Sequence, residues 1–342
     1  MKKELNEQKT QREYYFDNLK FILILLVVIA HVISPLGKLD VVRYIYRYIY
    51  IFHMPCFIFV SGYFAKKSIS SGTLKNNKVL NYMLLYIIFQ IIFTIINSGK
   101  YSFYQSQMGL WYIQCLIIWT MALPMIDRIK PVYGIIIAVM AGLIIGFDAT
   151  AGHVASLSRL LVFMPFFVAG YYIKKEHIEK LFTYKNKILA FLFMIIFSIV
   201  LYKYYPSIPS LLNLVSGKAS YEAMKLGYSG VLYRLGWYVA AGLISTALLV
   251  LIPKKKYFFS KVGEKTLQIF CLHLIICVLM RQSGVYEHLN SNTGFSILIV
   301  FCIVITFILS SKIVSYPFNA IMKMKFKHIL KKEDSTKKSN TF

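Results

Sequence analysis

The chain has 342 residues, of which 58% are hydrophobic and 16% aromatic, and it carries a formal net charge of +25. A soluble globular domain has about 45–50% apolar residues, fewer than this chain. The recurring apolar stretches of about 20 residues exclude a soluble protein and predict an all-α, polytopic transmembrane helical bundle. The basic residues alternate with the apolar stretches and form no single patch, which argues against nucleic acid as a partner and is typical of cytoplasmic loops.

About ten apolar segments are predicted to span the membrane as one domain. They are 19–36, 44–64, 79–97, 109–126, 132–147, 158–173, 188–204, 231–252, 266–280 and 295–315. We expect a cytoplasmic N-terminal segment at 1–18, a transmembrane domain at 19–315 and a basic cytoplasmic tail at 316–342. Because basic residues concentrate in alternate loops, an even number of spans with both termini in the cytoplasm is predicted, in a multi-pass protein of the cell membrane.

The first span carries three ionisable residues, Asp17, Lys20 and His31. Lys20 and His31 are eleven residues apart, about three helical turns, so they share one face with His31 roughly 16 Å further along the helix. Asp17 lies close to the same stripe. Lys20 by itself is also compatible with a cationic anchor that extends to the membrane surface. An ionisable residue inside the hydrocarbon is costly, so His31 is a candidate functional residue.

The second span combines His53 with Pro55, which removes one helix hydrogen bond. Interrupted helices are tolerated in membranes where they are buried in protein or line a cavity. We therefore expect His53 to face a cavity together with His31. Arg47 lies among tyrosines in the same span, a surface that suits a sugar or another polar ligand, although such aromatics also occur as interface residues.

Three later residues are further candidates, and each has a structural alternative. Trp111 suits either a membrane-interface anchor or a ligand surface. Arg159, at the start of the sixth predicted span, is either an anchor or part of a site bounded by a bent helix. His273 is another histidine within an apolar segment. The five cysteines are isolated within apolar stretches, and no zinc-binding pattern is present, so no metal is expected.

Several motifs together resemble the acyltransferase family 3 membrane proteins, and most closely the fucose 4-O-acetylase-like branch. They are Tyr15-Phe16-Asp17-Asn18-Leu19-Lys20 with His31, Phe52-His53-Met54-Pro55, Ser61-Gly62, Leu110-Trp111-Tyr112-Ile113, Arg159 with Pro165-Phe166-Phe167 and Gly170-Tyr171, and Leu272-His273. Lys20 stands where the family usually has arginine, which keeps the charge but loses the bidentate geometry.

The resemblance implies O-acetylation of a sugar hydroxyl on a cell-envelope or exported polysaccharide, with cytoplasmic acetyl-CoA as the donor co-substrate and membrane lipid around the protein. His31 would be the catalytic residue, either as a general base or by accepting the acetyl group and passing it on. The remaining site residues would be Lys20, Asp17 and Arg159 for the donor, and His53, Arg47, Trp111 and His273 for the acceptor.

A different class of protein, a transporter or flippase of a polar lipid-linked sugar, also fits the intramembrane histidines and interrupted helices. The lack of an evident duplicated half weakens this alternative. Consumption of acetyl-CoA by the purified protein would distinguish the two. The sequence leaves the oligomeric state open.

Overall fold

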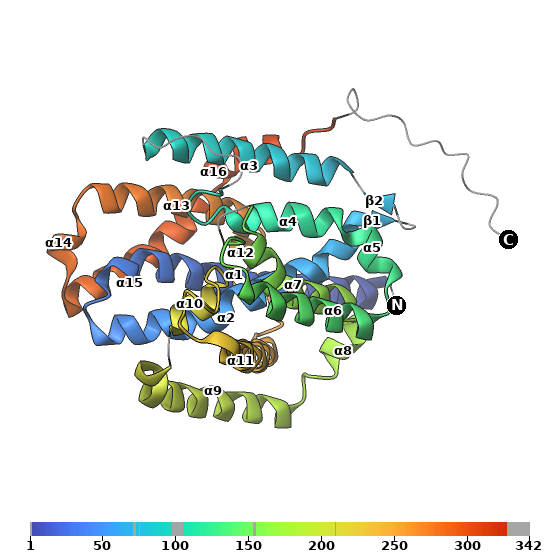
Figure 1. The fold of residues 1–342 in the computed structure, drawn as a ribbon. Helices are drawn as coiled ribbons and strands as arrows, with labels where there is room; N and C mark the ends of the chain where they lie inside the picture. The colour runs from blue at the N-terminus through green and yellow to red at the C-terminus, as the bar shows by residue number, and fades with distance from the viewer. Residues whose placement is uncertain are drawn as a thin grey trace.

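The computed structural model describes residues 2–70, 73–74, 76–97, 105–152, 155–208 and 210–326, and these form a bundle of α-helices (Figure 1). The helices are α1 (Lys2–Ile33), α2 (Asp40–Ala65), α3 (Asn76–Ile96), α4 (Trp111–Met121), α5 (Leu123–Arg128), α6 (Pro131–Ile144), α7 (Leu157–Tyr172), α8 (Lys175–Glu179), α9 (Tyr184–Tyr204), α10 (Leu211–Ser216), α11 (Gly230–Leu251), α12 (Ser260–Gly263), α13 (Thr266–Gln282), α14 (Tyr286–Leu289), α15 (Asn292–Leu309) and α16 (Lys312–Met322). A short antiparallel hairpin follows α2, and its two strands, β1 (Ile69–Ser70) and β2 (Thr73–Leu74), have two residues each.

Six helices in the described ranges are long and apolar enough to cross a membrane, which confirms a helical membrane protein. They correspond to the segments Tyr14–Leu36, Asp40–Ser68, Asn77–Ile96, Tyr184–Ser207, Gly227–Leu251 and Asn292–Leu309. Four shorter apolar helices coincide with the other four predicted spans: Trp111–Met121, Pro131–Phe147, Leu157–Tyr172 and Thr266–Gln282. A helix of 16 residues is about 24 Å long, less than the roughly 30 Å of a bilayer core, so the count of ten spans stays a prediction.

Some boundaries differ from the predicted ones for local reasons. The predicted span 109–126 consists of two helices, α4 and α5, which meet at Ala122. The predicted span 295–315 ends at Leu309, and α16 starts anew after Ser311, whose hydroxyl caps it by accepting from the Val314 amide. The predicted tail therefore begins inside a helix, while residues from 327 on lie outside the described part of the chain.

Helices α1 and α2 lie in the middle of the bundle (Figure 1). Helices α12, α13 and α15 pack against α1, while α7 and α11 pack against α2. In the view of Figure 1, α3 and α16 lie along the top and α9 along the bottom, with α8 and the hairpin at the right and α14 at the left. We call the end of the bundle nearer Lys20 the lysine end and the end nearer His31 the histidine end.

Two glycines allow α2 and α7 to approach backbone to backbone. A Cβ atom on Gly62 of α2 would lie 2.0 Å from the carbonyl oxygen of Phe167, and one on Gly170 of α7 would lie 1.9 Å from that of Phe59. Small residues serve this purpose in membrane bundles, where packing rather than hydrophobicity holds helices together. The contact aligns the two helices that carry His53 and Arg159.

Helix α2 continues through Pro55 because another helix replaces the lost hydrogen bond. Pro55 has no amide hydrogen to give the carbonyl of Ile51, four residues earlier. The indole Nε1 of Trp237 in α11 donates to that carbonyl instead, over 2.9 Å. A polar group in the bilayer needs such an internal partner, so this bond also ties α11 to α2.

We predict that Gly62→Ala lowers the thermal unfolding midpoint of the purified protein, because forcing a methyl group into a packed contact costs about 1–3 kcal/mol. Gly242→Ala in α11 is the matched control: nothing lies within 4 Å of a Cβ there, and alanine is the better helix former. Equal midpoints for the two variants would contradict the close contact of α2 and α7.

Candidate functional site

A cavity of about 250 Å³ lies near the histidine end, between α1, α2, α4, α7, α10 and α13, and we call it the histidine cavity. It is lined by His31, Tyr50, His53, Met54, Met108, Gly109, Trp111, Arg159, Phe163, Val215, Ser216, Phe270, Leu274, Cys277 and Arg281. Four residues singled out from the sequence, from four different helices, therefore meet here: His31, His53, Trp111 and Arg159.

His31 is paired with His273 of α13. Nδ1 of His31 lies 2.8 Å from Nε2 of His273, and the two rings are parallel within 3°. Nδ1 of His273 lies 3.0 Å from the carbonyl oxygen of Ile269, which can only accept a hydrogen bond. In a neutral His273 the proton must therefore be on Nδ1, and Nε2 accepts from Nδ1 of His31. This assignment leaves Nε2 of His31 with a free lone pair.

His53 is held in the same way. Its Nδ1 lies 2.7 Å from the carbonyl oxygen of Ile49 one turn earlier in α2, so its Nε2 is also the unprotonated nitrogen when the ring is neutral. The ring of Tyr50 contacts His53 at 4.8 Å and His31 at 6.4 Å between centroids. One side of the cavity is thus formed by His31, Tyr50 and His53.

Two guanidinium groups face these rings. Arg159 donates from Nε to the carbonyl of Ser216 over 3.1 Å, and its guanidinium carbon lies 4.8 Å from the centre of the Trp111 ring. Arg281 donates to the hydroxyl of Ser34 over 3.0 Å. No acidic side chain is among the described residues that line the cavity. Two cations without a carboxylate favour a ligand or a reaction intermediate with negative charge.

A second, smaller cavity of about 140 Å³ lies toward the lysine end and is lined by Lys20, Lys78 and Ser61 among others; we call it the lysine cavity. Lys20 is 2.7 Å from the carboxylate of Asp17. Lys20 and Lys67 both lie over the ring of Phe64, at 5.4 and 5.5 Å from its centre. Three lysines with one nearby carboxylate make this end a candidate site for phosphate groups.

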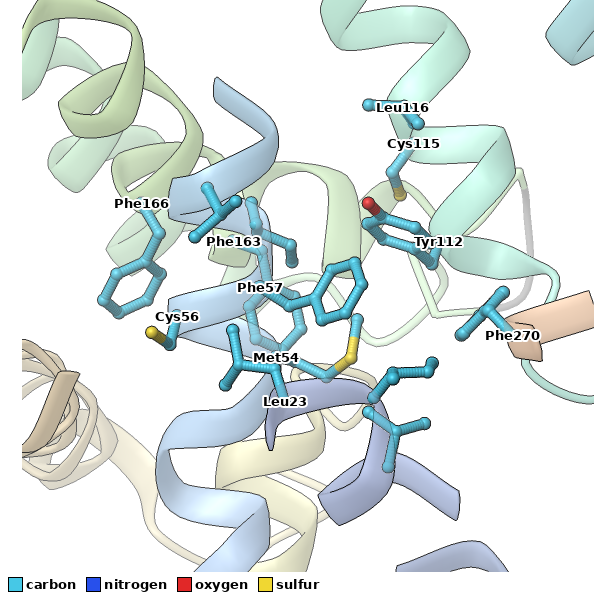
Figure 2. Close-up of a cluster of buried hydrophobic side chains, with 14 of the residues drawn as sticks. Leu23, Met54, Cys56, Phe57, Tyr112, Cys115, Leu116, Phe163, Phe166 and Phe270 are labelled. Carbon is cyan, nitrogen blue, oxygen red and sulfur yellow. The ribbon is translucent and has the colours of Figure 1, made fainter. Parts of the chain in front are cut away.

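Three aromatic side chains belong to the linings of the two cavities and contact one another, and we call them the aromatic partition: Phe57, Tyr112 and Phe270, labelled in Figure 2. Tyr112 meets Phe57 and Phe270 edge-on, with centroids 5.7 and 5.1 Å apart. Ser61 donates to the carbonyl of Phe57 over 2.9 Å and accepts from the Tyr112 hydroxyl, 2.7 Å away. Phe57 and Tyr112 line the lysine cavity, and Phe270 lines the histidine cavity.

The structure separates residues that the sequence analysis had grouped together. Asp17 and Lys20 lie at the lysine end, whereas Arg159, expected to share the donor site with them, lies with His31. His273 supports His31 through its hydrogen bond. Arg47 lines neither cavity and stacks its guanidinium on Tyr205, 5.1 Å from the ring centre.

Sequence reasoning did not assign Tyr50, Arg281 or Tyr112 to the site. Tyr50 precedes His53 by three residues and therefore shares its helix face, a signal that was available in the sequence. Arg281 follows His273 at the end of the same helix, where a cation is usually an interface anchor. Tyr112 follows Trp111 in a family-like motif, but only the packing of α4 shows that it meets Phe57 and Phe270. Within the described residues, no group of three metal-binding side chains is placed to hold a metal ion.

A family model described as an acyltransferase domain matches residues 13–311, which include both cavities. The match does not distinguish among branches of the family. A search of proteins of curated function and a search of solved structures found no match to this chain.

We predict that neutral His53 and His273 both carry their proton on Nδ1, since each Nδ1 faces a carbonyl oxygen. Solid-state NMR of ¹⁵N-histidine-labelled protein in lipid bilayers would identify the tautomers, with resonances assigned from His53→Gln and His273→Gln variants. A proton on Nε2 of neutral His273 would contradict the arrangement that leaves Nε2 of His31 unprotonated.

Proposed function

Because the chain belongs to the acyltransferase 3 family, we propose that it transfers an acetyl group from acetyl-CoA to a sugar hydroxyl of a cell-envelope or exported polysaccharide. The observation that carries this proposal is the pairing of His31 with His273, which supplies an unprotonated ring nitrogen beside two guanidinium groups in one cavity. The fucose 4-O-acetylase-like branch is the subfamily that we propose.

The donor binds from the lysine end. Lys20, with Lys67 and Lys78 nearby, would contact the phosphate groups of acetyl-CoA, and Asp17 would hold Lys20 in position. The pantetheine arm would follow α1 from Lys20 toward His31, a rise of about 16 Å. We infer that the aromatic partition closes this route, because Tyr112 contacts both Phe57 and Phe270. Rotation of Tyr112 away from Phe270 would open it, with Ser61 available to bond an amide of the arm.

His31 performs the proton transfer. Its Nε2 takes the proton from the acceptor hydroxyl as that oxygen attacks the thioester carbonyl carbon. His31 is then a cation, stabilised because its Nδ1–H donates to Nε2 of His273, whose own Nδ1–H is held by the carbonyl of Ile269. When the tetrahedral intermediate collapses, the carbon–sulfur bond breaks and Nε2 returns the proton to the departing thiolate. Direct transfer of this kind needs no acetylated histidine.

Arg159 stabilises the negative charge that develops on the thioester oxygen. Its guanidinium lines the same cavity as His31 and is oriented beforehand by Ser216 and Trp111. A fixed cation in a water-poor site is more effective than the same cation in water. His53 and Trp111 then remain to position the sugar.

The proposed orientation places the lysine end and both termini in the cytoplasm of a cell-membrane protein. Its support is the concentration of Lys66-Lys67, Lys174-Lys175 and Lys254-Lys255-Lys256 in alternate loops. Donor binding at the lysine end requires the same orientation, since acetyl-CoA is cytoplasmic.

We predict that Lys20→Ala and His31→Ala separate donor binding from catalysis. His31→Ala should bind acetyl-CoA normally but lose about a hundred- to ten-thousand-fold in acetyl transfer, the usual contribution of a general base. His31→Gln should fail as well, because glutamine cannot take up the proton. Lys20→Ala should weaken acetyl-CoA binding, and Lys20→Arg should retain most of it because the charge is kept.

Calorimetry with the purified protein measures donor binding. Mass spectrometry of envelope glycans, from cells that lack the gene and express each variant, measures acetylation. Asp17→Asn combined with Lys20→Ala controls for the carboxylate that the single substitution leaves unpaired. Lys218→Ala, in the loop before α11, is the control for net charge. Normal acetylation by a well-folded His31→Ala protein would refute the mechanism.

We predict that reporter fusions ending at residues 70, 180 and 258 give the cytoplasmic signal, whereas a fusion ending at residue 217 does not. Alkaline phosphatase and green fluorescent protein provide complementary readouts. Opposite signals for the fusions at 70 and 258 would place the two loops on different sides and would exclude the proposed orientation.

A further inference from the structure

An apolar groove of about 620 Å³ lies outside the histidine cavity, between α9 and α11, with α2 and α10 at its base. The side chains of α9 beside it are apolar and exposed, among them Phe191, Ile195 and Ile199. In a protein that spans a bilayer, such a surface faces lipid chains. The proposed mechanism makes no use of this groove.

Only one short helix separates the groove from the histidine cavity. Leu211 and Leu214 of α10 line the groove, whereas Val215 and Ser216 of the same helix line the cavity. Trp237 makes a second connection, because it lines the groove and its ring meets that of Phe163, a cavity residue, with centroids 5.7 Å apart. A molecule in the groove is therefore next to the site of chemistry.

The histidine end of the groove carries positive charge. Arg47 lies one turn before Ile51, which lines the groove, and its guanidinium stacks on Tyr205. Lys203 lies over the ring of Tyr204, another groove residue, at 5.3 Å from the ring centre. Neither Arg47 nor Lys203 forms an ion pair with a carboxylate among the described residues. These cations would suit a phosphate group at the end of an apolar chain.

We propose that the groove binds the hydrocarbon chain of a lipid phosphate that carries the sugar acceptor, with its phosphate at Arg47 and Lys203 and its sugar reaching the histidine cavity past α10. The acceptor is then a membrane-bound glycolipid intermediate of the polyprenyl phosphate class. A finished polymer in water would have no use for a lipid-facing groove beside the site. The identity of the sugar-carrying lipid as substrate rests on the proposed acetyl transfer, whereas the binding of the lipid does not.

The lipid phosphate provides the selectivity in this proposal. Lipid tails are as apolar as the groove, so the chain alone gains little by entering it. The contacts of the phosphate with Arg47 and Lys203 add the specific part of the affinity. The uncharged alcohol of the same chain should therefore bind much more weakly than the phosphate.

Two glycines of α11 allow a matched test. Nothing lies within 4 Å of a Cβ on either Gly236 or Gly242, but only Gly236 lines the groove. Gly236→Phe would place a ring at the groove from a position where the Cβ meets no neighbour, and Gly242→Phe adds the same side chain elsewhere on the same helix. Both proteins would be purified in nanodiscs of phosphatidylcholine.

The probe is geranylgeranyl phosphate with a photoreactive group in its chain. We expect the wild-type protein and Gly242→Phe to be labelled on α9 or α11. Gly236→Phe should lose this labelling, and Arg47→Ala combined with Lys203→Ala should lose the preference for the phosphate over geranylgeraniol. Equal labelling of Gly236→Phe and Gly242→Phe would overturn the proposal. So would equal competition by phosphatidylglycerol, since the groove would then hold ordinary membrane lipid.

Acetylation in cells and binding of acetyl-CoA distinguish this proposal from the proposed function. Gly236→Phe should bind acetyl-CoA normally but acetylate envelope glycans several-fold less than Gly242→Phe. Normal acetylation by Gly236→Phe would refute the role of the groove and leave acetyl transfer standing. Labelling of the groove in a wild-type protein that transfers no acetyl group would refute the proposed function and retain the lipid site.

Discussion

The lack of water inside a bilayer is the constraint on which the site depends, because every polar group there must find its partner within the protein. His53 and His273 each find it in a backbone carbonyl one turn earlier on their own helix. This local bond determines which ring nitrogen carries the proton, and through His273 it also orients His31. A requirement for stability in the membrane thus produces the free lone pair that acid–base chemistry needs.

Helix α2 connects the parts of the molecule that the proposals bring together. The carbonyl of Ile51, freed by Pro55, binds Trp237 and so fixes α11, which forms one side of the apolar groove. Gly62 on the same helix allows α7 to come close, and α7 supplies Arg159. The proline and the glycine in two of the family-like motifs therefore have packing roles, while His53, two residues before the proline, lines the cavity.

Charge is divided between the two ends of the bundle. The lysine end holds the ammonium groups of Lys20 and Lys67 with one carboxylate, that of Asp17 beside Lys20, an arrangement suited to phosphate groups. The histidine end holds guanidinium groups that are already fixed, Arg159 by Ser216 and Trp111, and Arg281 by Ser34. The aromatic partition lies between them, so that the proposed mechanism assigns donor binding and chemistry to separate spaces and requires Tyr112 to move.

The sequence by itself determined the helical membrane class, confirmed by six long apolar helices, and the family, confirmed by the match over residues 13–311. It also predicted that Lys20 and His31 share a face, since helical periodicity is a local property. Only the tertiary structure decided that His31 pairs with His273, that Arg159 lies away from Lys20, and that Arg281 and Tyr112 belong to the site. The physical reason is that apolar residues surround every face of these helices, so the hydrophobic pattern marks a span but does not say which face meets which neighbour; packing of small residues and polar bonds between distant segments decides that.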